Sequence, residues 1–273
     1  MKTAALALAD FLSRHDNVLL LTGAGISTAS GIPGYRDEEG VRQGRAPIQG
    51  PEFRRLEEVR RRYWARSMVG WRTLARAQPN AGHYAVAELQ AKGHLGHILT
   101  QNVDGLHQRA GAQQVMEMHG SIHEVRCLAC GLQTSRATLQ QQLETLNPQA
   151  LASQAQPLPD GDAQLEPQNL DQFRVPSCNQ CGGMLQPDVV FFGDNLPAAR
   201  TQAILQATQE ADALLVAGSS LMVYSGYRLC KMAAAAGKPI AAINLGKTRA
   251  DDLLTLKVCA PTEQVLPELA TLV

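Results

Sequence analysis

Two Cys-x-x-Cys pairs constrain the fold of this chain more than any other feature. The first pair is Cys127 and Cys130, the second is Cys178 and Cys181, and a glycine follows each pair directly. Two such pairs supply four thiolates, the ligand set of a closed tetrahedral zinc site, although iron accepts the same ligands. We predict one structural Zn²⁺ per chain, with residues 131–177 looping out between the pairs. The alternative is four unrelated core cysteines.

The composition excludes several classes of protein. The 25 Lys and Arg balance the 25 Asp and Glu, so no basic field indicates a nucleic acid partner. No apolar run approaches the roughly 20 residues of a membrane span, so no membrane partner is expected either. Four of the six cysteines lie in the pairs, which is typical of a reducing compartment, and we expect a cytoplasmic protein. Residues 4–14 should form an amphipathic helix, with a cleaved signal peptide as the minor alternative.

Short apolar runs alternate with helical patterns along most of the chain. Apolar runs suit strands buried on both faces of a parallel sheet, and we expect such strands at 17–21, 95–99, 187–194, 213–217 and 239–243. The pattern is helical over 51–77, 84–91, 197–209, 227–236 and 261–271. This alternation predicts an α/β fold, a Rossmann-like doubly wound parallel sheet with a smaller zinc-binding domain formed by two insertions. We place the sheet domain at 1–40, 79–122 and 186–273, and the smaller helical and zinc-binding domain at 41–78 and 123–185.

A small-residue turn follows the first expected strand. Gly23-Ala24-Gly25 leads into Ser27 at the start of a helix, where free N–H groups and the helix dipole favour an anion such as a phosphate. Gly-x-Gly alone is weak evidence, and Thr28 stands where a dehydrogenase fingerprint has a third small residue. The acidic residue that such a fingerprint needs after a second strand is also missing. The turn therefore predicts a nucleotide site of a type other than a dehydrogenase.

Polar side chains follow the second expected strand directly. Gln101, Asn102 and Asp104 come after the apolar run 95–99, at the edge of an open α/β sheet where ligands bind. Asn and Asp also cap helices, and that alternative stays open for Asn102 and Asp104. His119 lies further along the chain and is one of seven histidines.

An ordered set of motifs resembles one family. It consists of Gly23-Ala24-Gly25-Ile26-Ser27, Ser30-Gly31-Ile32-Pro33, Thr100-Gln101-Asn102-Val103-Asp104, His119-Gly120, the two cysteine pairs, Phe192-Gly193-Asp194 and Gly218-Ser219-Ser220. Over nearly the whole chain this set resembles the sirtuins, which are NAD-dependent protein lysine deacylases. The stretches 62–66, 224–228 and 248–253 resemble the class II branch, which includes the mitochondrial lipoamidase and ADP-ribosyltransferase type.

The resemblance implies an NAD site built from several loops. Its residues would be Gly23, Ala24, Gly25, Ser27, Ile32, Tyr35, Arg36, Gln101, Asn102, Asp104, Gly218, Ser219, Ser220, Asn244 and Gly246. The glycine turn would contact the diphosphate and Gln101 the nicotinamide-side ribose. Asp104 would bind the nicotinamide amide in a pocket with Ile32, and Tyr35 would cover the reacting face.

The resemblance also implies catalytic roles for His119 and Asn102. His119 would act as general base on a ribose hydroxyl, a task that suits imidazole because its pKa lies near neutrality. Asn102 would hold a water or hydroxyl. The products would be free lysine, nicotinamide and O-acyl-ADP-ribose. The acylated lysine of a protein substrate would be bound by Val190, Phe192, Gly193 and Val223, with the backbone of 190–193 and 222–224 adding the substrate as a strand.

Tyr63 and Arg66 bear on the acyl group. They lie three residues apart on an expected helix and so share one face. A phenol beside a guanidinium can bind a carboxylate, and a similar Tyr-x-x-Arg pair in some sirtuins binds acidic acyl tails. We hypothesise a preference for acidic or long acyl groups over acetyl, the alternative being an ordinary surface pair.

Two departures from the family pattern and two rival functions remain. Gly34 stands where the family usually has Asp, which predicts a more mobile loop, and Ser225 stands where many members have Pro. One rival is a protein mono-ADP-ribosyltransferase that uses the same NAD site. The other is a non-catalytic zinc module that binds NAD, against which the intact set of Gln101, Asn102 and His119 argues.

Overall fold

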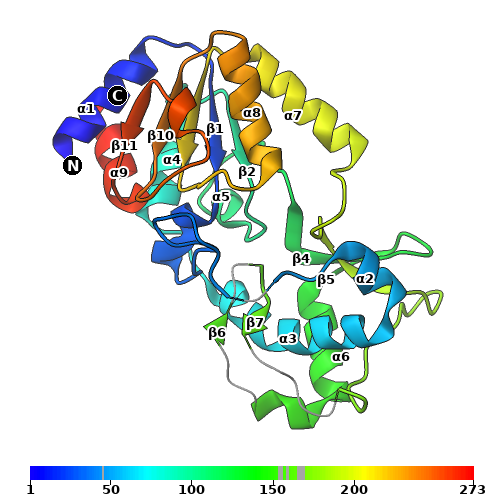
Figure 1. The fold of residues 1–273 in the computed structure, drawn as a ribbon. Helices are drawn as coiled ribbons and strands as arrows, with labels where there is room; N and C mark the ends of the chain where they lie inside the picture. Colours follow the sequence, from blue (N-terminus) through cyan, green and yellow to red (C-terminus); the bar gives the residue numbers. More distant parts are fainter. Residues whose placement is uncertain (45, 153–155, 158–159, 165–169) are drawn as a thin grey trace. The chain divides into compact units, whose positions relative to one another are not determined.

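The computed structural model describes residues 1–44, 46–152, 156–157, 160–164 and 170–273. The chain forms two compact units, shown in Figure 1. The first unit combines Met1–Gln43, Ala77–Met118 and Pro197–Val273, and the second combines Gly44–Arg76 and His119–Leu196. The second unit is thus formed by two insertions into the first.

A six-stranded parallel sheet forms the centre of the first unit, in the order β11-β10-β9-β1-β2-β3. Its strands are β1 (Val18–Thr22), β2 (His97–Thr100), β3 (Met116–Glu117), β9 (Ala213–Ala217), β10 (Ile240–Ile243) and β11 (Leu256–Val258). The chain runs outward from β1 through β2 and β3, then returns to β9 on the other side of β1. This reversal defines a doubly wound sheet. The predicted Rossmann-like fold is confirmed.

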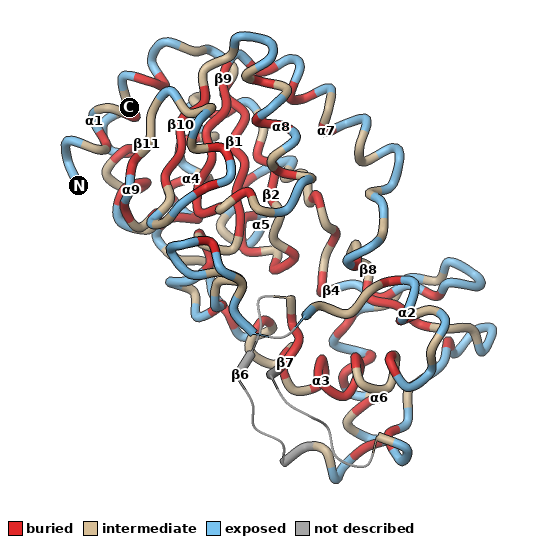
Figure 2. Tube along the Cα trace, viewed as in Figure 1, coloured by how far each residue is buried: buried red, intermediate tan, exposed pale blue. Residues whose placement is uncertain are grey.

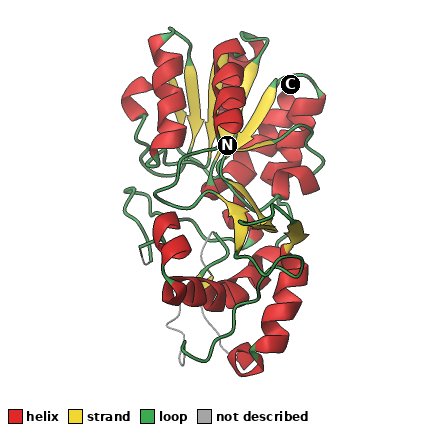
Figure 3. Cartoon of the chain, turned by 90° about the vertical axis from the view of Figure 1, so that its right-hand side faces the viewer, coloured by secondary structure: helices red, strands yellow, loops and turns green. Residues whose placement is uncertain are grey.

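Helices cover both faces of this sheet, as Figures 1 and 3 show. On one face α9 (Thr262–Leu272) packs against α1 (Lys2–Ser13) and α4 (Ala81–Ala91), and on the other α7 (Ala198–Glu210) packs against α8 (Tyr224–Ala235). Every residue of β1 and β9 is buried, as the red strands in Figure 2 show. A strand that is apolar at every position needs cover on both faces, and this arrangement supplies it.

The second unit contains a three-stranded antiparallel sheet in the order β5-β4-β8. Its strands are β4 (Gly120–Cys127), β5 (Gln133–Ser135) and β8 (Leu185–Val189), and its helices are α2 (Gly50–Arg55), α3 (Glu57–Arg76) and α6 (Arg136–Leu146). The segment after α6 forms η2 (Pro148–Ala152) and the short pair β6 (Gln156–Pro157) and β7 (Ala163–Gln164).

Aromatic side chains form the core of the second unit. Phe53 of α2 stacks on Phe191 with ring centroids 4.9 Å apart, and Tyr63 of α3 meets the same Phe191 ring at 5.2 Å. The guanidinium of Arg136 lies over the rings of Trp64 at 5.5 Å and Trp71 at 4.9 Å. Cation–π contacts of this kind lower the cost of burying an arginine.

The structure corrects the expected boundaries at several points. The run 187–194 was expected as a strand of the parallel sheet, but β8 pairs antiparallel with β4, so 119–122 and 186–196 belong to the second unit. The helix expected over 51–77 is two helices, because Leu56 has extended backbone (φ −108°, ψ 117°). The glycine turn opens a 3₁₀ helix, η1 (Ala24–Ser30), and β3 and β11 were not expected.

Part of the expected polar excursion around residues 156–162 lies outside the described residues. In the part of the chain that is described, no helix combines the length and the apolar character that a membrane span needs.

The central place of β1 gives a first prediction. Leu20 is fully buried (0% exposed), so Leu20→Ala should leave a cavity that costs about 2–5 kcal/mol of unfolding free energy in urea titration. The matched control is Leu6→Ala on α1, because Leu6 is 49% exposed and its loss should cost about 0.5 kcal/mol or less. Equal losses in the two variants would contradict the position of β1 in the core.

Candidate functional site

The carboxyl ends of four parallel strands bring most of the predicted NAD residues to one edge of the first unit. β1 ends before Gly23, β2 before Gln101, β9 before Gly218 and β10 before Asn244. The loops are joined by hydrogen bonds: the Gly25 N–H donates to the Gly218 carbonyl (2.7 Å), and the Gly218 N–H donates to the Ile243 carbonyl (2.8 Å). This edge is where ligands bind in doubly wound sheets.

The glycines of this edge are required by close backbone contact. A Cβ on Gly25 would lie 2.8 Å from the Cα of Gly218, and one on Gly218 would lie 2.3 Å from the Ile26 nitrogen. Gly218 also has φ +64°, a conformation that side chains disfavour. A Cβ on Gly23 would lie 2.7 Å from the Cβ of Ser219. The two loops therefore present main-chain groups at close range, which suits the binding of a diphosphate.

Asn102, Ser27 and Asp104 form a linked polar group behind the glycine turn. The Asn102 amide nitrogen donates to the Gly23 carbonyl and to the Ser27 hydroxyl, both at 3.1 Å. The Ser27 hydroxyl donates to Asp104 Oδ2 at 2.7 Å. Asp104 Oδ1 also accepts the N–H of Leu106 (2.9 Å), the first residue of the short helix α5 (Leu106–Arg109), whose N-cap residue is Gly105. This one side chain therefore contacts both the start of a helix and the candidate site.

The remaining predicted NAD residues lie on loops at the same edge. Gln101 Nε2 donates to the Ser219 hydroxyl (3.1 Å), and Asn244 Nδ2 donates to the Gly246 carbonyl (3.0 Å). Ile32 is buried, and Ala24, Tyr35 and Ser220 are partly exposed.

The loop that carries Tyr35 and Arg36 is held by its own contacts. Arg36 donates to the Gly40 carbonyl (2.8 Å), and the Lys247 N–H donates to the Glu38 carbonyl (2.7 Å). At Gly34 an added Cβ would meet only the Arg36 carbonyl, at an ordinary 3.5 Å. The backbone therefore does not require glycine at 34, and the expected extra mobility of this loop stays a prediction.

Sequence reasoning missed a buried histidine pair beneath this group. His83 and His107 have ring centroids 5.0 Å apart. The Thr22 hydroxyl donates to Thr100 (2.9 Å) and so accepts from His107 Nε2 (2.9 Å). Burial lowers the pKa of His107 to about 3 and that of His83 to about 4. Both rings are therefore neutral near pH 7.

The bonds of His83 define its tautomer and link it to the site. Its Nδ1 accepts the Asn80 N–H (3.3 Å), so Nε2 carries the proton and faces the Ser27 hydroxyl at 3.4 Å. The only sequence signal for His83 as part of a helix cap was the pattern Asn80-x-x-His83. In this pattern the N-cap residue is followed three residues later by its hydrogen-bond partner. His83 therefore contacts both the start of α4, through Asn80, and the candidate site, through Ser27.

His119 and three of the four predicted substrate residues belong to the second unit. The His119 carbonyl accepts the Val190 N–H (2.8 Å), and the Phe192 carbonyl accepts the Gly50 N–H (2.9 Å). Gly193 has φ +81° and is exposed, as Phe192 is. The fourth residue, Val223, lies in the first unit directly before α8 and has extended backbone (φ −77°, ψ 127°).

The segment that contains Val190 and Phe192 is anchored to α2 by an ion pair. Asp194 accepts two bonds from the Arg54 guanidinium, at 2.5 and 2.9 Å. A Cβ on Gly50 would lie 2.3 Å from the Asp194 carboxylate, so glycine is needed for this approach. On the other side of His119 in the chain, the Met118 N–H donates to the Thr100 carbonyl (2.8 Å), two residues before Asn102.

Tyr63 and Arg66 are buried in the second unit and do not form an ordinary surface pair. Arg66 is 4% exposed, and its guanidinium binds both oxygens of the Asp162 carboxylate, at 2.8 and 2.6 Å. Its Nε also donates to the Ala163 carbonyl (3.1 Å). Tyr63 packs among Phe53 and Phe191, and burial raises the pKa of its hydroxyl well above the usual range.

The four paired cysteines meet in the second unit. Their sulfur atoms all lie within 4.8 Å of one another, with Cys127 and Cys181 at 3.5 Å and Cys130 and Cys178 at 3.8 Å. Four sulfurs on a tetrahedral zinc with bonds of about 2.3 Å would be about 3.8 Å apart, so this donor set fits zinc.

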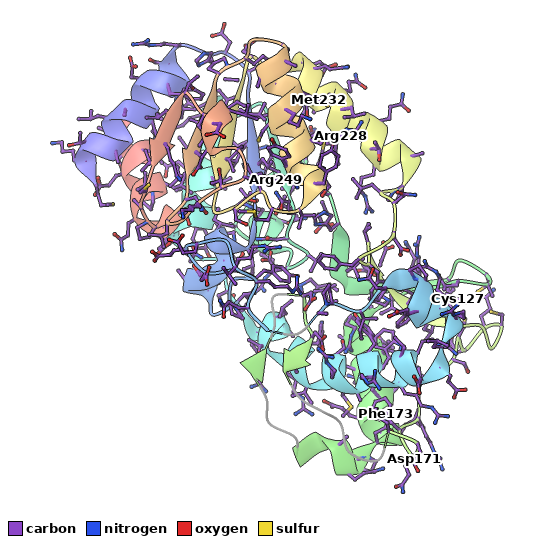
Figure 4. The ribbon with its side chains drawn as sticks, viewed as in Figure 1. Cys127, Asp171, Phe173, Arg228, Met232 and Arg249 are labelled. Carbon is purple, nitrogen blue, oxygen red and sulfur yellow. The ribbon has the colours of Figure 1, made fainter. Side chains whose placement is uncertain are left out.

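The backbone of each pair is shaped for a metal. A glycine with positive φ follows each one, and its N–H donates to the carbonyl of the first cysteine: Gly131 to Cys127 (3.0 Å) and Gly182 to Cys178 (2.8 Å). Figure 4 labels Cys127 at the end of β4. The predicted four-cysteine module is confirmed, and the reading as unrelated core cysteines is wrong.

Comparison with known proteins assigns the family. The sequence pattern of the Sir2 family matches residues 23–225. The chain belongs to the Sir2 family. An NAD-dependent protein deacetylase of Bordetella bronchiseptica is 52% identical to this sirtuin over 265 residues, 97% of each chain. NAD-dependent protein deacetylase 2 of Bradyrhizobium diazoefficiens is 51% identical and covers 94% of this chain and 96% of its own length.

Solved structures give the same family. A complex described as Sir2-p53 peptide-NAD+ has a TM-score of 0.78 at 28% identity, over 97% of this chain and 96% of that chain. One described as Sir2 bound to acetylated peptide has a TM-score of 0.76 at 28% identity, over 97% of both chains.

The metal centre gives a second prediction. Cys127→Ser should lose bound zinc, measured by elemental analysis of the purified protein, and should lower the unfolding midpoint because the metal holds β4 to the segment before β8. Cys259→Ser is the matched control, since Cys259 is exposed and lies outside the cluster. Zinc retained at one ion per chain in Cys127→Ser would contradict the assignment.

The histidine pair gives a third prediction, for pH dependence. The pKa of His107 is about 3 in the folded chain and about 6.5 when unfolded, so the unfolded state binds more protons between these values. The unfolding free energy should therefore fall as the pH drops from about 7 to 5, by up to about 1.4 kcal/mol per pH unit for this side chain. His107→Gln should flatten this slope, measured by urea unfolding at each pH. An unchanged slope, equal to that of the partly exposed control His94→Gln, would contradict the neutral buried assignment.

Proposed function

We propose that this sirtuin is an NAD-dependent protein deacetylase that removes acetyl, and related acyl groups, from protein lysines. The observation that carries this proposal is the linked group of Asn102, Ser27 and Asp104 beside the glycine turn, with Gln101 on the same edge. Relatives that align over almost their full length are NAD-dependent protein deacetylases, and related structures hold an acetylated peptide or NAD.

The residues of the first unit would bind and orient NAD, which supplies an anomeric carbon bearing nicotinamide as leaving group. Main-chain N–H groups at Ala24 and Ser219 would hold the diphosphate, because those of Gly23, Gly25 and Gly218 already donate to carbonyls of the protein. Gln101 would bind the nicotinamide-side ribose, and Asp104 with Ile32 would orient the nicotinamide amide. Because Asn102 is fixed by Gly23 and Ser27, it could position a hydroxyl or water without a large entropic cost.

His119 would accept a proton from a ribose hydroxyl, the role for which imidazole is best suited near neutral pH. The acyl oxygen of the lysine would bond to the anomeric carbon as nicotinamide leaves. Overall, acyl-lysine, NAD and water give lysine, nicotinamide and O-acyl-ADP-ribose, so atoms and charge balance. Val190, Phe192 and Val223 would hold the peptide backbone as an added strand.

The fourth prediction tests this function. Nicotinamide release from NAD should depend on an acetyl-lysine peptide, and His119→Ala should lower that release by about 100-fold or more, as expected for loss of a general base. His123→Ala is the matched control, because His123 lies on β4, four residues after His119, which directly precedes that strand. Peptide-independent release with label transferred from NAD to protein would instead favour mono-ADP-ribosyltransfer. No release under either condition would favour the non-catalytic zinc module.

The acyl preference is a finer proposal, and the structure sharpens it. The Arg66 guanidinium is bound by the Asp162 carboxylate. The carboxylate of an acidic acyl tail would therefore have to displace Asp162 in order to bind Arg66. Burial, with the like charge of Asp160 adding to it, raises the pKa of Asp162 to about 6, so this carboxylate gives up its charge more readily than most. The aromatic surroundings of Tyr63 support long, apolar acyl chains equally well. We propose that long apolar acyl groups bind without disturbing the Arg66–Asp162 ion pair. The carboxylate of an acidic acyl group would compete with Asp162 for the Arg66 guanidinium.

The fifth prediction follows from that competition. Asp162→Ala should raise kcat/KM for a glutaryl-lysine peptide relative to an acetyl-lysine peptide, because it frees the Arg66 guanidinium. Arg66→Gln in the same background should remove the gain. Since loss of one partner of a buried ion pair is destabilising, the readout is the ratio of the two substrates within each variant. An unchanged glutaryl-to-acetyl ratio would contradict the role of Arg66.

Two further assignments stay proposals. Membership of the class II branch is supported by the stretches 62–66, 224–228 and 248–253, which fall in α3, at the start of α8 and at the turn into η3 (Asp251–Leu253). A cytoplasmic location is supported by the four thiols of the metal cluster, which bind zinc only when they are reduced.

A further inference from the structure

The stretches 224–228 and 248–253, which resemble the class II branch, lie side by side in the first unit. The proposed chemistry gives neither of them a role. Tyr224 and Tyr227 lie in the first turn of α8, and their ring centroids are 6.4 Å apart. The Arg249 guanidinium lies over both rings, 4.5 Å from the centroid of Tyr227 and 5.7 Å from that of Tyr224. Figure 4 shows Arg249 beside the lower end of α8.

Arg249 is fixed to the loop that carries a proposed substrate residue. The backbone N–H of Arg249 donates to the Ser220 carbonyl (2.8 Å), and the side-chain Nη1 of Arg249 donates to the Met222 carbonyl (3.3 Å). Met222 directly precedes Val223, which is 38% exposed and has extended backbone. A peptide that pairs with residues 222–224 would therefore pass close to this guanidinium.

The Arg249 side chain contacts a carbonyl and two rings but has no acidic partner among the described residues. Among the described residues it forms no ion pair, and neither does Arg228, which lies one helical turn after Tyr224 on the same face of α8. The two carboxylates that follow Arg249 in the chain do not pair with it. Asp251 forms an ion pair with Lys257, and Asp252 is exposed and forms no ion pair with either arginine.

The chemistry of this patch favours an anion. A guanidinium has about five N–H donors in a rigid fork, and Arg249 uses one of them on Met222. Stacking on two rings removes much of the rotamer freedom that binding would otherwise cost, so the charge is preorganised. Tyr224 is 55% exposed, which leaves an apolar surface for the methylene groups of a bound side chain.

We propose that Arg249, held by Tyr224 and Tyr227 with Arg228 beside it, selects acyl-lysines that have an Asp or Glu close by in the substrate peptide. The inference rests on the proposed deacetylase function and specifies which protein segments it acts on. A carboxylate near the acylated lysine accepts the free N–H donors of Arg249, while a lysine at the same position is repelled by Arg249 and Arg228.

The test measures deacetylation of matched peptides. Each peptide carries one acetyl-lysine among alanines, with Glu, Ala or Lys placed in turn at the three positions before and after it. For the wild-type enzyme, Glu at one or two of these positions should lower KM about threefold to tenfold relative to Ala, and Lys should raise it. This preference should shrink as salt is raised from about 0.05 to 0.5 M, because salt screens exposed charges.

Variants separate charge recognition from a bracing role. Arg249→Gln should bring the Glu-to-Ala ratio of KM close to one, and Arg228→Gln should reduce it less. Arg249→Lys keeps the charge but loses the planar fork, so it should retain part of the ratio. Lys231→Gln is the matched control, an exposed cation of the same helix, and should leave the ratio as in wild type.

Two results would overturn the inference and leave the enzyme function intact. One is wild-type turnover of all peptides with no preference for Glu. The other is an Arg249→Gln variant in which KM rises by the same factor for every peptide, which a mere brace of residues 220–222 would produce. If the wild-type chain deacetylates no peptide at all, the proposed function fails and the inference fails with it.

Discussion

The close approach of two backbone loops is the constraint on which the rest of the first unit depends. The loop after β1 and the loop after β9 touch through Gly25 and Gly218, where neither position has room for a Cβ. This contact brings the two loops together at the carboxyl edge of the sheet, where the neighbouring N–H groups of Ala24 and Ser219 would hold a diphosphate without a cationic side chain. A chain with no net charge can therefore bind a strongly anionic nucleotide, because the field that attracts it is local.

The polar side chains behind that contact form one connected system. Asn102 is held by Gly23 and Ser27, Ser27 is held by Asp104, and a neutral His83 approaches Ser27 from below. Buried polar groups of this kind are costly unless each is satisfied, and a satisfied network fixes the orientation of its members. The side chains that would contact NAD are thus positioned before it binds. Because His83 and His107 are buried in the neutral form, the stability of this arrangement depends on pH.

Much of this arrangement could be predicted from the sequence, for reasons that differ from residue to residue. The strands β1 and β9 are apolar at every position, and the cysteine pairs have a spacing that only a few structures need, so both were identified correctly. The strand β8 was expected in the wrong sheet, because the sequence of a short strand does not show which partner it pairs with, and β4 supplied that partner. The Asp162 that holds Arg66 could not be foreseen, since the two lie far apart in the chain and only the fold brings them together. The histidine pair was missed because a histidine that supports a site has no pattern that separates it from one that catalyses.

The most direct test of the account is the stoichiometry of the reaction. Purified chain, NAD and an acetyl-lysine peptide would be followed by mass spectrometry, with nicotinamide, free-lysine peptide and acetylated ADP-ribose measured in the same sample. If the chain carries out NAD-dependent deacetylation, the three products appear in equal amounts and none appears when NAD is omitted. Loss of acetyl groups as free acetate without consumption of NAD would contradict it, because the residues at the sheet edge would then have no part in the chemistry.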